Sequence, residues 1–169
     1  MVSLLVLLVG PHLTRVAMSL KLVKTREDRQ HIHRFARNFY EASPYHDKLD
    51  YNSSKVDRLL DLAASSSYTQ CLPLLYEENG IPCGCLLGVA SSTPFSDDLI
   101  ASELCWWVDE KYRGTKGSLE LVLAYEDWAK RVGCKVITMA LLSTTNPKID
   151  TYYRRMGYEK CEVSYVKEL

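Results

Sequence analysis

The most informative stretch of this chain runs from residue 108 to residue 118 and reads VDEKYRGTKGS. The segment before it, residues 100–108, is rich in large apolar side chains and predicts a β-strand. The segment after it, residues 117–131, carries apolar side chains at helical spacing and is followed by Gly133, which predicts a helix. The stretch is therefore a tight turn between a strand and a helix.

Two glycines and two cationic residues make this turn suitable for binding an anion. Gly114 and Gly117 allow a tight backbone, so that free amides at the helix start face an anion, which the helix dipole also attracts. Arg113 and Lys116 add positive charge at the same place. A diphosphate suits such a turn, although a glycine turn before a helix is more often only a turn. The Gly-Lys-Ser/Thr ending of a Walker loop is missing.

The rest of the chain alternates between helical and strand-like spacing. The apolar residues predict, in chain order, strand 19–25, helices 28–42 and 56–63, strands 70–76, 83–90 and 100–108, helix 117–131, strand 134–141, helix 147–155 and strand 159–166. Asn79-Gly80 predicts a hairpin, and residues 91–98 predict a polar loop. This order predicts a single α/β domain with a mixed, mostly antiparallel central sheet and flanking helices.

Composition limits the partners of this chain. Its 169 residues suffice for one domain, and 21 Lys and Arg residues balance 21 Asp and Glu residues. This balance gives no overall positive field, so we expect neither nucleic acid nor a membrane as a partner. The six cysteines form no pair of Cys-x-x-Cys knuckles, and the four histidines add no recognisable ligand pattern. We expect reduced thiols in a cytoplasmic protein, and no metal site.

The apolar segment at residues 1–9 is unlike a signal peptide. No Lys or Arg precedes it and no small-x-small cleavage site follows it, and it is too short to span a bilayer. We expect residues 1–17 to be an extension ahead of a domain at residues 18–169, with Met18 as an alternative start.

A second stretch, residues 146–158, reads NPKIDTYYRRMGY. It resembles the segment of GNAT acyltransferases in which an asparagine precedes a short helix carrying a tyrosine, followed by glycine and an aromatic residue. The residues at the family's spacing are Asn146, Ile149, Tyr153, Gly157 and Tyr158. Residues 113–118 are similar to the same family's pyrophosphate signature, Arg/Gln-x-x-Gly-x-Gly/Ala. The likeness covers residues 19–169. The sequence Tyr112-Arg113-Gly114, with no second Gly-x-Gly after it, is also similar to that of short acyltransferases carried by bacteriophages.

The resemblance implies an N-acetyltransferase that moves an acetyl group from acetyl-CoA directly to an amine. It implies that acetyl-CoA lies against Trp107, Val108, Arg113, Gly114, Thr115, Lys116, Gly117, Ser118 and Asn146. Lys116 departs from the family's central glycine. Its side chain would crowd the pyrophosphate if the backbone needs positive φ, or its ammonium would pair with the phosphates. Ser118 in place of the last Gly/Ala is a milder change.

The resemblance also gives Tyr153 a catalytic role, the donation of a proton to the CoA sulfur. The alternative is a packing role, because Ile149 and Met156 share a helix face with Tyr153. Tyr152 competes on the same geometry, and only the family spacing selects Tyr153.

Glu103 is the candidate base, because a carboxylate in an otherwise apolar strand favours a raised pKa. Strand alternation puts it on the face of Cys105 and Trp107, one position from where family members with a glutamate base carry it. A bulge near the strand end would restore the face, and an exposed strand glutamate is the alternative. The backbone around Trp107 and Val108 would supply the N–H that binds the thioester oxygen.

Three functions stay open at this point. One is an active enzyme, and another is an inactive protein of the same shape that only binds or supports a partner. The third is a nucleotide-phosphate binder unrelated to this family, against which the missing Walker ending argues. The acceptor, a small-molecule or protein amine, is equally open, and the aromatic residues near Phe39, Tyr40 and Tyr45 are candidates for its pocket. We expect a monomer or a homodimer.

Overall fold

The structure is a computed structural model that describes residues 18–169, so the expectation for residues 1–17 lies outside the described residues. Along this part the elements follow in the order β1 (Met18–Leu22), α1 (Arg26–Ala42), α2 (Ser53–Ser65), β2 (Cys71–Glu78), β3 (Ile81–Thr93), β4 (Ser96–Val108), η1 (Glu110–Tyr112), α3 (Lys116–Arg131), β5 (Val136–Thr138) and α4 (Lys148–Arg155). Every predicted element is present except the last strand.

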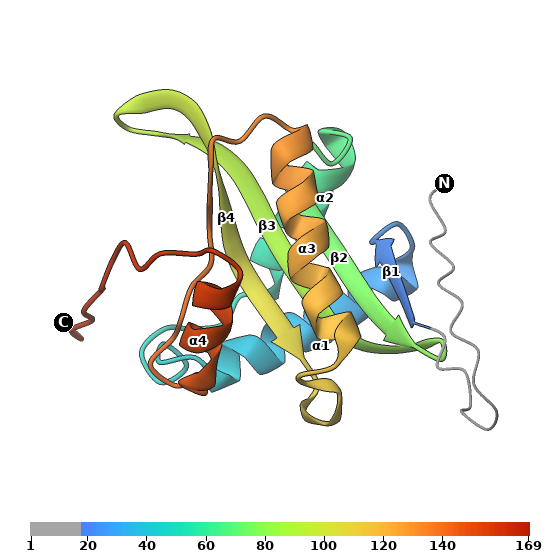
Figure 1. Cartoon of the computed structure of the whole chain (residues 1–169). Helices are drawn as coiled ribbons and strands as arrows, with labels where there is room; N and C mark the ends of the chain where they lie inside the picture. The colour runs from blue at the N-terminus through green and yellow to red at the C-terminus, as the bar shows by residue number, and fades with distance from the viewer. Residues whose placement is uncertain (1–17) are drawn as a thin grey trace.

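The five strands form one sheet in the order β1-β2-β3-β4-β5. The first four are antiparallel neighbours, whereas β4 and β5 run parallel because α3 crosses over between them. One face of the sheet carries α3 and the other carries α1 and α2, as Figure 1 shows. The prediction of a single α/β domain with a mixed, mostly antiparallel sheet is confirmed.

Two hydrophobic cores lie on the two faces of the sheet, and β2 contributes alternate side chains to each. Leu72, Leu74 and Tyr76 pack on the side of α3, whereas Leu75 packs with α1 and α2. A strand buried on both faces reads as a continuous apolar run, which residues 71–76 are.

The start of α1 is fixed by a capping box of Thr25 and Asp28. Burial alone would raise the pKa of the Asp28 carboxyl. Hydrogen bonds from Lys21 and from the backbone amides of Lys24 and Thr25 outweigh that effect and hold the pKa well below its usual range. The first helix is therefore anchored to β1 at its N-terminus.

The hairpin at Asn79-Gly80 is confirmed, because both residues take positive φ, 52° and 76°. The prediction of a polar loop at residues 91–98 is wrong. β3 and β4 stay paired through most of this segment, and only Pro94 and Phe95 lie at the turn of a long hairpin that projects beyond the helices (Figure 1). This end of the hairpin is exposed, which explains its polar sequence.

The prediction of a strand at residues 159–166 is also wrong, because these residues are exposed and pair with no strand. Their alternation indicates strand propensity, but a strand needs a partner edge. The neighbouring edge is short: β5 covers Val136–Thr138 in place of the predicted 134–141. Just beyond it, both backbone groups of Ala140 bond to side chains of other elements, so they are not available to a ladder.

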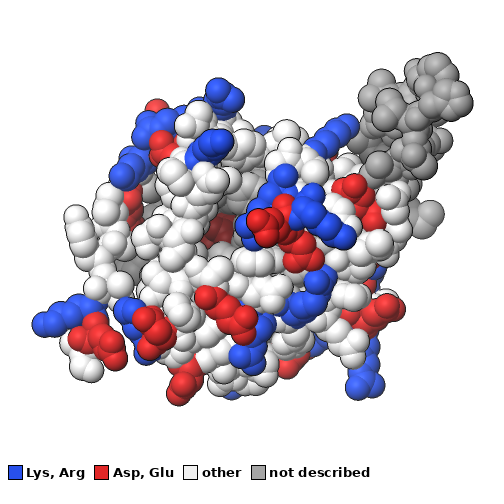
Figure 2. Space-filling view, turned by 90° about the horizontal axis from the view of Figure 1, so that it is seen from below, with Lys and Arg blue, Asp and Glu red and all other residues white. Residues whose placement is uncertain are grey.

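The face of the molecule drawn in Figure 2 shows no dominant charge. Lys and Arg intermingle with Asp and Glu over the face drawn in Figure 2, in keeping with the balanced composition. None of the helices formed by residues 18–169 is long and apolar enough to cross a membrane. All six cysteines are free thiols, and Cys71, Cys83, Cys85 and Cys105 are buried.

Candidate active site

The site lies where β4 and β5 separate. Their pairing ends at Ser102 and Thr138, after which β4 continues to Val108 while the other chain turns away toward α4. The space between them opens into a cavity of about 430 Å³. Its walls come from the end of α1, from β4 and the turn after it, and from residues 140–153.

A β-bulge at Leu104 turns Glu103 into this cavity. Leu87 pairs with Cys105 while the next residue of β3, Gly88, pairs with Glu103, so Leu104 is the extra residue. Cys105 therefore packs in the core under α1 and α2, whereas Glu103 lines the cavity together with Trp106. Because of the bulge, Glu103 faces the cavity, whereas simple strand alternation would place it on the face of Cys105.

The environment of Glu103 favours its neutral form. Burial raises the pKa of the Glu103 carboxyl to about 7, and the backbone N–H groups of Ala140 and Trp106 oppose part of that rise. The N–H of Ala140 donates to Glu103 Oε2 over 3.1 Å. A carboxyl with this pKa exchanges protons near neutral pH.

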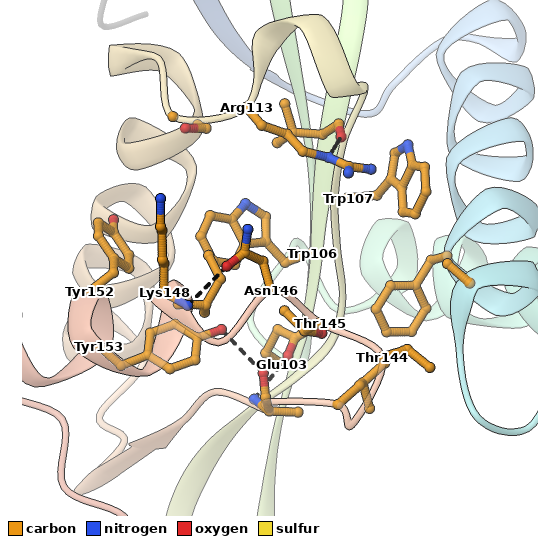
Figure 3. Close-up of a pocket in the computed structure, with 18 residues that line it drawn as sticks. Glu103, Trp106, Trp107, Arg113, Thr144, Thr145, Asn146, Lys148, Tyr152 and Tyr153 are labelled. Carbon is orange, nitrogen blue, oxygen red and sulfur yellow. Dashed lines mark hydrogen bonds between the residues drawn. The ribbon is translucent and has the colours of Figure 1, made fainter.

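Tyr153 and Glu103 both form hydrogen bonds with the backbone of Ala140. Its hydroxyl donates to the carbonyl of Ala140 over 3.1 Å, and in Figure 3 it points toward Glu103. Burial raises the pKa of Tyr153, and the nearby Glu103 carboxyl adds to the rise, so the phenol stays protonated. Met156 packs against the core on the side of α3, and the ring of Tyr158 lies 5.7 Å from that of Tyr153.

Tyr152 and Trp106 also line the cavity, with ring centroids 6.0 Å apart. The hydroxyl of Tyr152 and the indole N–H of Trp106 are buried and have no hydrogen-bond partner within residues 18–169. Burial raises the pKa of Tyr152 to about 12. No sequence pattern predicted a role for Trp106, which is one of several large apolar residues in its strand.

Arg113 stands at the other end of the cavity. Its Nε donates to the carbonyl of Val108 over 2.8 Å, and its guanidinium lies 5.0 Å from the centre of the Trp107 ring. Trp107 is held in turn by Asp109, whose carboxylate accepts from the indole N–H over 3.0 Å. The guanidinium is thus fixed at the mouth of the site.

The backbone of Val108 faces the cavity side of β4. Asp109 N–H donates to Cys83 on β3, and in an antiparallel ladder neighbouring residues point opposite ways. The N–H and C=O of Val108 therefore point away from β3, as the bond from Arg113 to its carbonyl also requires. Of the two backbones proposed from the sequence, Val108 has the N–H that faces the site, and that of Trp107 faces β3.

The start of α3 leaves its amides free for a ligand. Thr115 is the N-cap residue, yet no side chain caps the helix, since its hydroxyl donates to Tyr112 and that of Ser118 donates back to Thr115. The first amides of a helix have no partner within it and attract anions. Gly114, with φ of +73°, makes the turn that brings the chain to this position.

Lys116 does not crowd this helix start. Its φ is not positive, because positive φ in the described chain is confined to Ser67, Tyr68, Asn79 and four glycines. The side chain is 65% exposed and its Nζ lies 3.9 Å from Glu120. Glycine is required at position 117 by packing, since a Cβ there would lie 2.1 Å from the ring of Tyr76.

Asn146 and Lys148 form the wall opposite Arg113. Asn146 Oδ1 accepts from the backbone N–H of Lys148 over 3.0 Å, which fixes the start of α4 and leaves the amide nitrogen of Asn146 free of that bond. In Figure 3 Asn146, Lys148 and Trp106 direct nitrogen atoms toward the side on which Arg113 lies. Lys148 was not singled out in the sequence.

The structure brings most of the predicted site residues together. The cavity is lined by Glu103, Trp107, Val108, Arg113, Gly114, Ser118, Asn146 and Tyr153, whereas Thr115, Lys116 and Gly117 lie in the adjoining turn. Of the three aromatic candidates for an acceptor pocket, Phe39 lines the cavity; Tyr40 and Tyr45 do not. Within residues 18–169, no group of three or more His, Cys, Asp and Glu side chains is placed to hold a metal ion.

Most of the chain matches a known protein family. Residues 26–158 match the family model described as Acetyltransferase (GNAT) family. No curated protein sequence matches the chain.

Solved structures share the fold at low sequence identity. Glucosamine-6-phosphate N-acetyltransferase from Arabidopsis thaliana is similar with a TM-score of 0.67 and 12% identity, covering 89% of this chain and 97% of that one. Aminoglycoside N-acetyltransferase AAC(6')-Iy in complex with CoA has a TM-score of 0.67 and 12% identity, covering 95% and 99%. Ribosomal-protein-alanine N-acetyltransferase from Brucella melitensis biovar Abortus 2308 has a TM-score of 0.65 and 14% identity, covering 90% and 99%.

Proposed function

The chain belongs to the GNAT acetyltransferase family, and from this premise we propose that it is an active N-acetyltransferase that transfers the acetyl group of acetyl-CoA directly to an amine. The observation that carries the proposal is the meeting of Glu103 and Tyr153 at Ala140. One is a carboxyl that titrates near neutrality and the other is a phenol that keeps its proton. A base and an acid that both contact Ala140 suit a reaction in which the amine loses a proton and the thiolate gains one.

Residues at both ends of the cavity contribute to the binding of acetyl-CoA. The free amides at the start of α3 and the guanidinium of Arg113 bind the pyrophosphate, since both offer donors to an anion. Asn146 and Lys148 donate from the opposite wall. The fit is supported by the absence of a side-chain cap on α3 and by the outward position of Lys116.

The reaction needs three groups of this chain. The carboxylate of Glu103 accepts a proton from the ammonium of the acceptor, so that the neutral nitrogen forms a bond to the thioester carbon. The N–H of Val108 binds the carbonyl oxygen while negative charge develops on it. The carbon–sulfur bond then breaks and Tyr153 donates its proton to the sulfur, while the second proton of the acylated nitrogen passes to the Tyr153 phenolate and restores the phenol. We further propose that the protein acts in the cytoplasm, as a monomer or homodimer, without nucleic acid.

Acetyl-CoA turnover tests the proposed function. Full-length protein is incubated with acetyl-CoA and a panel of amines, and free thiol is measured over time. We expect thiol release that depends on an amine and is lost in Glu103→Gln. Binding of CoA without turnover on any amine would favour the alternative, a GNAT-shaped protein that has lost catalysis.

A further inference from the structure

We propose that the acceptor is a small monoamine whose amino group is carried on an aliphatic or aromatic body, and not a polycation such as a polyamine or an aminoglycoside. This inference rests on the proposed function, because it takes the cavity to be shared by acetyl-CoA and the acceptor.

The cavity divides into a cosubstrate part and a part left for the acceptor. Arg113, Gly114 and Ser118 line the end beside the start of α3, and Glu103 and Tyr153 mark the reacting atoms. The acceptor wall is formed by Phe39 and Ala42 of α1, by Trp107 of β4 and by Leu142, Thr144 and Thr145 between β5 and α4. Figure 3 shows Thr144 at the end of the cavity away from Arg113.

The charge of the lining admits one ammonium group. Among residues 18–169, Glu103 is the single carboxylate that lines the cavity, against the two cations Arg113 and Lys148. An ammonium that leaves water needs a carboxylate or a full set of hydrogen-bond acceptors. Glu103 serves the amino group that reacts, and a second ammonium would meet an aromatic or aliphatic wall, or neutral threonine hydroxyls.

Acidic residues near this wall do not supply the missing charge. Glu41, one residue before Ala42, lies 4.0 Å from Arg37 on the same helix, and Asp47 lies 2.5 Å from Lys48. Their charges are matched within their own segment. Neither residue lines the cavity.

The same wall favours an apolar body on the amine. The side chains of Phe39, Leu142 and Trp107 are only partly exposed, and all three border the cavity. Apolar atoms of an acceptor placed against them leave water, and each methylene buried in this way strengthens binding by about fourfold. Aromatic acceptors add ring contacts with Phe39 and Trp107.

A matched pair of amines tests the inference. Hexylamine and hexamethylenediamine have the same six-carbon chain, and the diamine carries a second ammonium group on its last carbon. Calorimetric titration into full-length protein saturated with CoA needs no turnover. We expect hexylamine to bind at least about tenfold more tightly than the diamine, and propylamine to bind more weakly than hexylamine.

Equal or tighter binding of the diamine would overturn the inference, as would a preference for kanamycin or for a peptide amine over hexylamine. A missing signal for CoA itself would instead remove the proposed function, so the two failures are distinguishable.

Ala42 offers a way to change the preference. It is exposed in the last turn of α1, so a larger side chain there leaves the core intact. The variants Ala42→Glu and Ala42→Gln have the same size and differ in charge. We expect the ratio of diamine to monoamine affinity to be about tenfold higher in the Glu variant than in the Gln variant. The same ratio in both would show that this wall does not contact the acceptor, and would overturn the inference.

Discussion

At the scale of single residues, two adjacent tyrosines of α4 differ in what their hydroxyl groups contact. Tyr153 donates to the carbonyl of Ala140, whereas the buried hydroxyl of Tyr152 has no partner. The sequence placed both in the same short helix, and only the family spacing favoured Tyr153. The contacts separate them because they depend on where the chain runs after β5, which no local pattern predicts.

Tyr153→Phe is expected to lower kcat by about a hundredfold or more while the affinity for CoA stays nearly unchanged, because only the acidic hydroxyl is lost. Loss of its hydrogen bond to Ala140 should cost about 1 kcal/mol of stability. Tyr152→Phe is the matched control, since it removes a hydroxyl with no partner. Steady-state kinetics and urea unfolding of both variants measure these effects. Equally small effects of the two on kcat would leave Tyr153 a packing residue.

Glu103 gives the reaction a pH dependence. Its pKa is raised to about 7, so the ionised base is present above that pH and kcat/KM should fall about tenfold per unit below it. Glu103→Gln keeps an acceptor for the N–H of Ala140 and should lose both the activity and this limb of the profile. A wild-type profile that stays flat down to a pH of about 5 would exclude Glu103 as the base.

The same pKa has a consequence for stability. The folded protein binds this proton more tightly than the unfolded chain, whose carboxyl titrates near 4.5. The free energy of unfolding should therefore decrease as pH rises from 4.5 to about 7, and this contribution should be absent in Glu103→Gln.

At the scale of elements, the sequence predicted the order of strands and helices up to α4, but not the long hairpin of β3 and β4, the early end of β5 or the absence of a strand at residues 159–166. The periods of β2, α1 and α3 are set by side chains that lie on one or two buried faces, and such periods are visible locally. From the sequence a bulge in this strand was only one possibility. The two-residue period of a strand does not show where an extra, unpaired residue such as Leu104 lies. β5 ends early because Ala140 bonds to Glu103 and Tyr153, and both partners are remote in sequence.

The two glycines beside α3 are required for different reasons, and this separates their substitution effects. A Cβ on Gly117 would lie 2.1 Å from the Tyr76 ring, so Gly117→Ala should destabilise by about 3 kcal/mol. Gly114 has open space around it but φ of +73°, so Gly114→Ala should cost about 1 kcal/mol. Urea unfolding compares the two. A larger loss at Gly114 would mean that the turn, and not the contact with β2, limits this region.

At the scale of the whole molecule, the fold joins two motifs that are separate in sequence. Residues 113–118 follow β4 and residues 146–158 contain α4, and both border one cavity because β4 and β5 part beyond Ser102. The family spacing predicted that these motifs act together. The acceptor wall was harder to predict, since Phe39 and Ala42 reach the cavity only through the packing of α1 against the sheet.

Calorimetric titration of CoA into three forms of the full-length protein tests whether CoA binds at the start of α3 beside Arg113. The wild type should bind CoA, and Arg113→Glu should bind at least about tenfold more weakly, because a cation next to the phosphates is reversed. Lys111→Glu makes the same change of charge on a side chain that packs on Tyr112 and does not line the cavity, and it should match the wild type. No binding by the wild type, or equal weakening in both variants, would contradict the account.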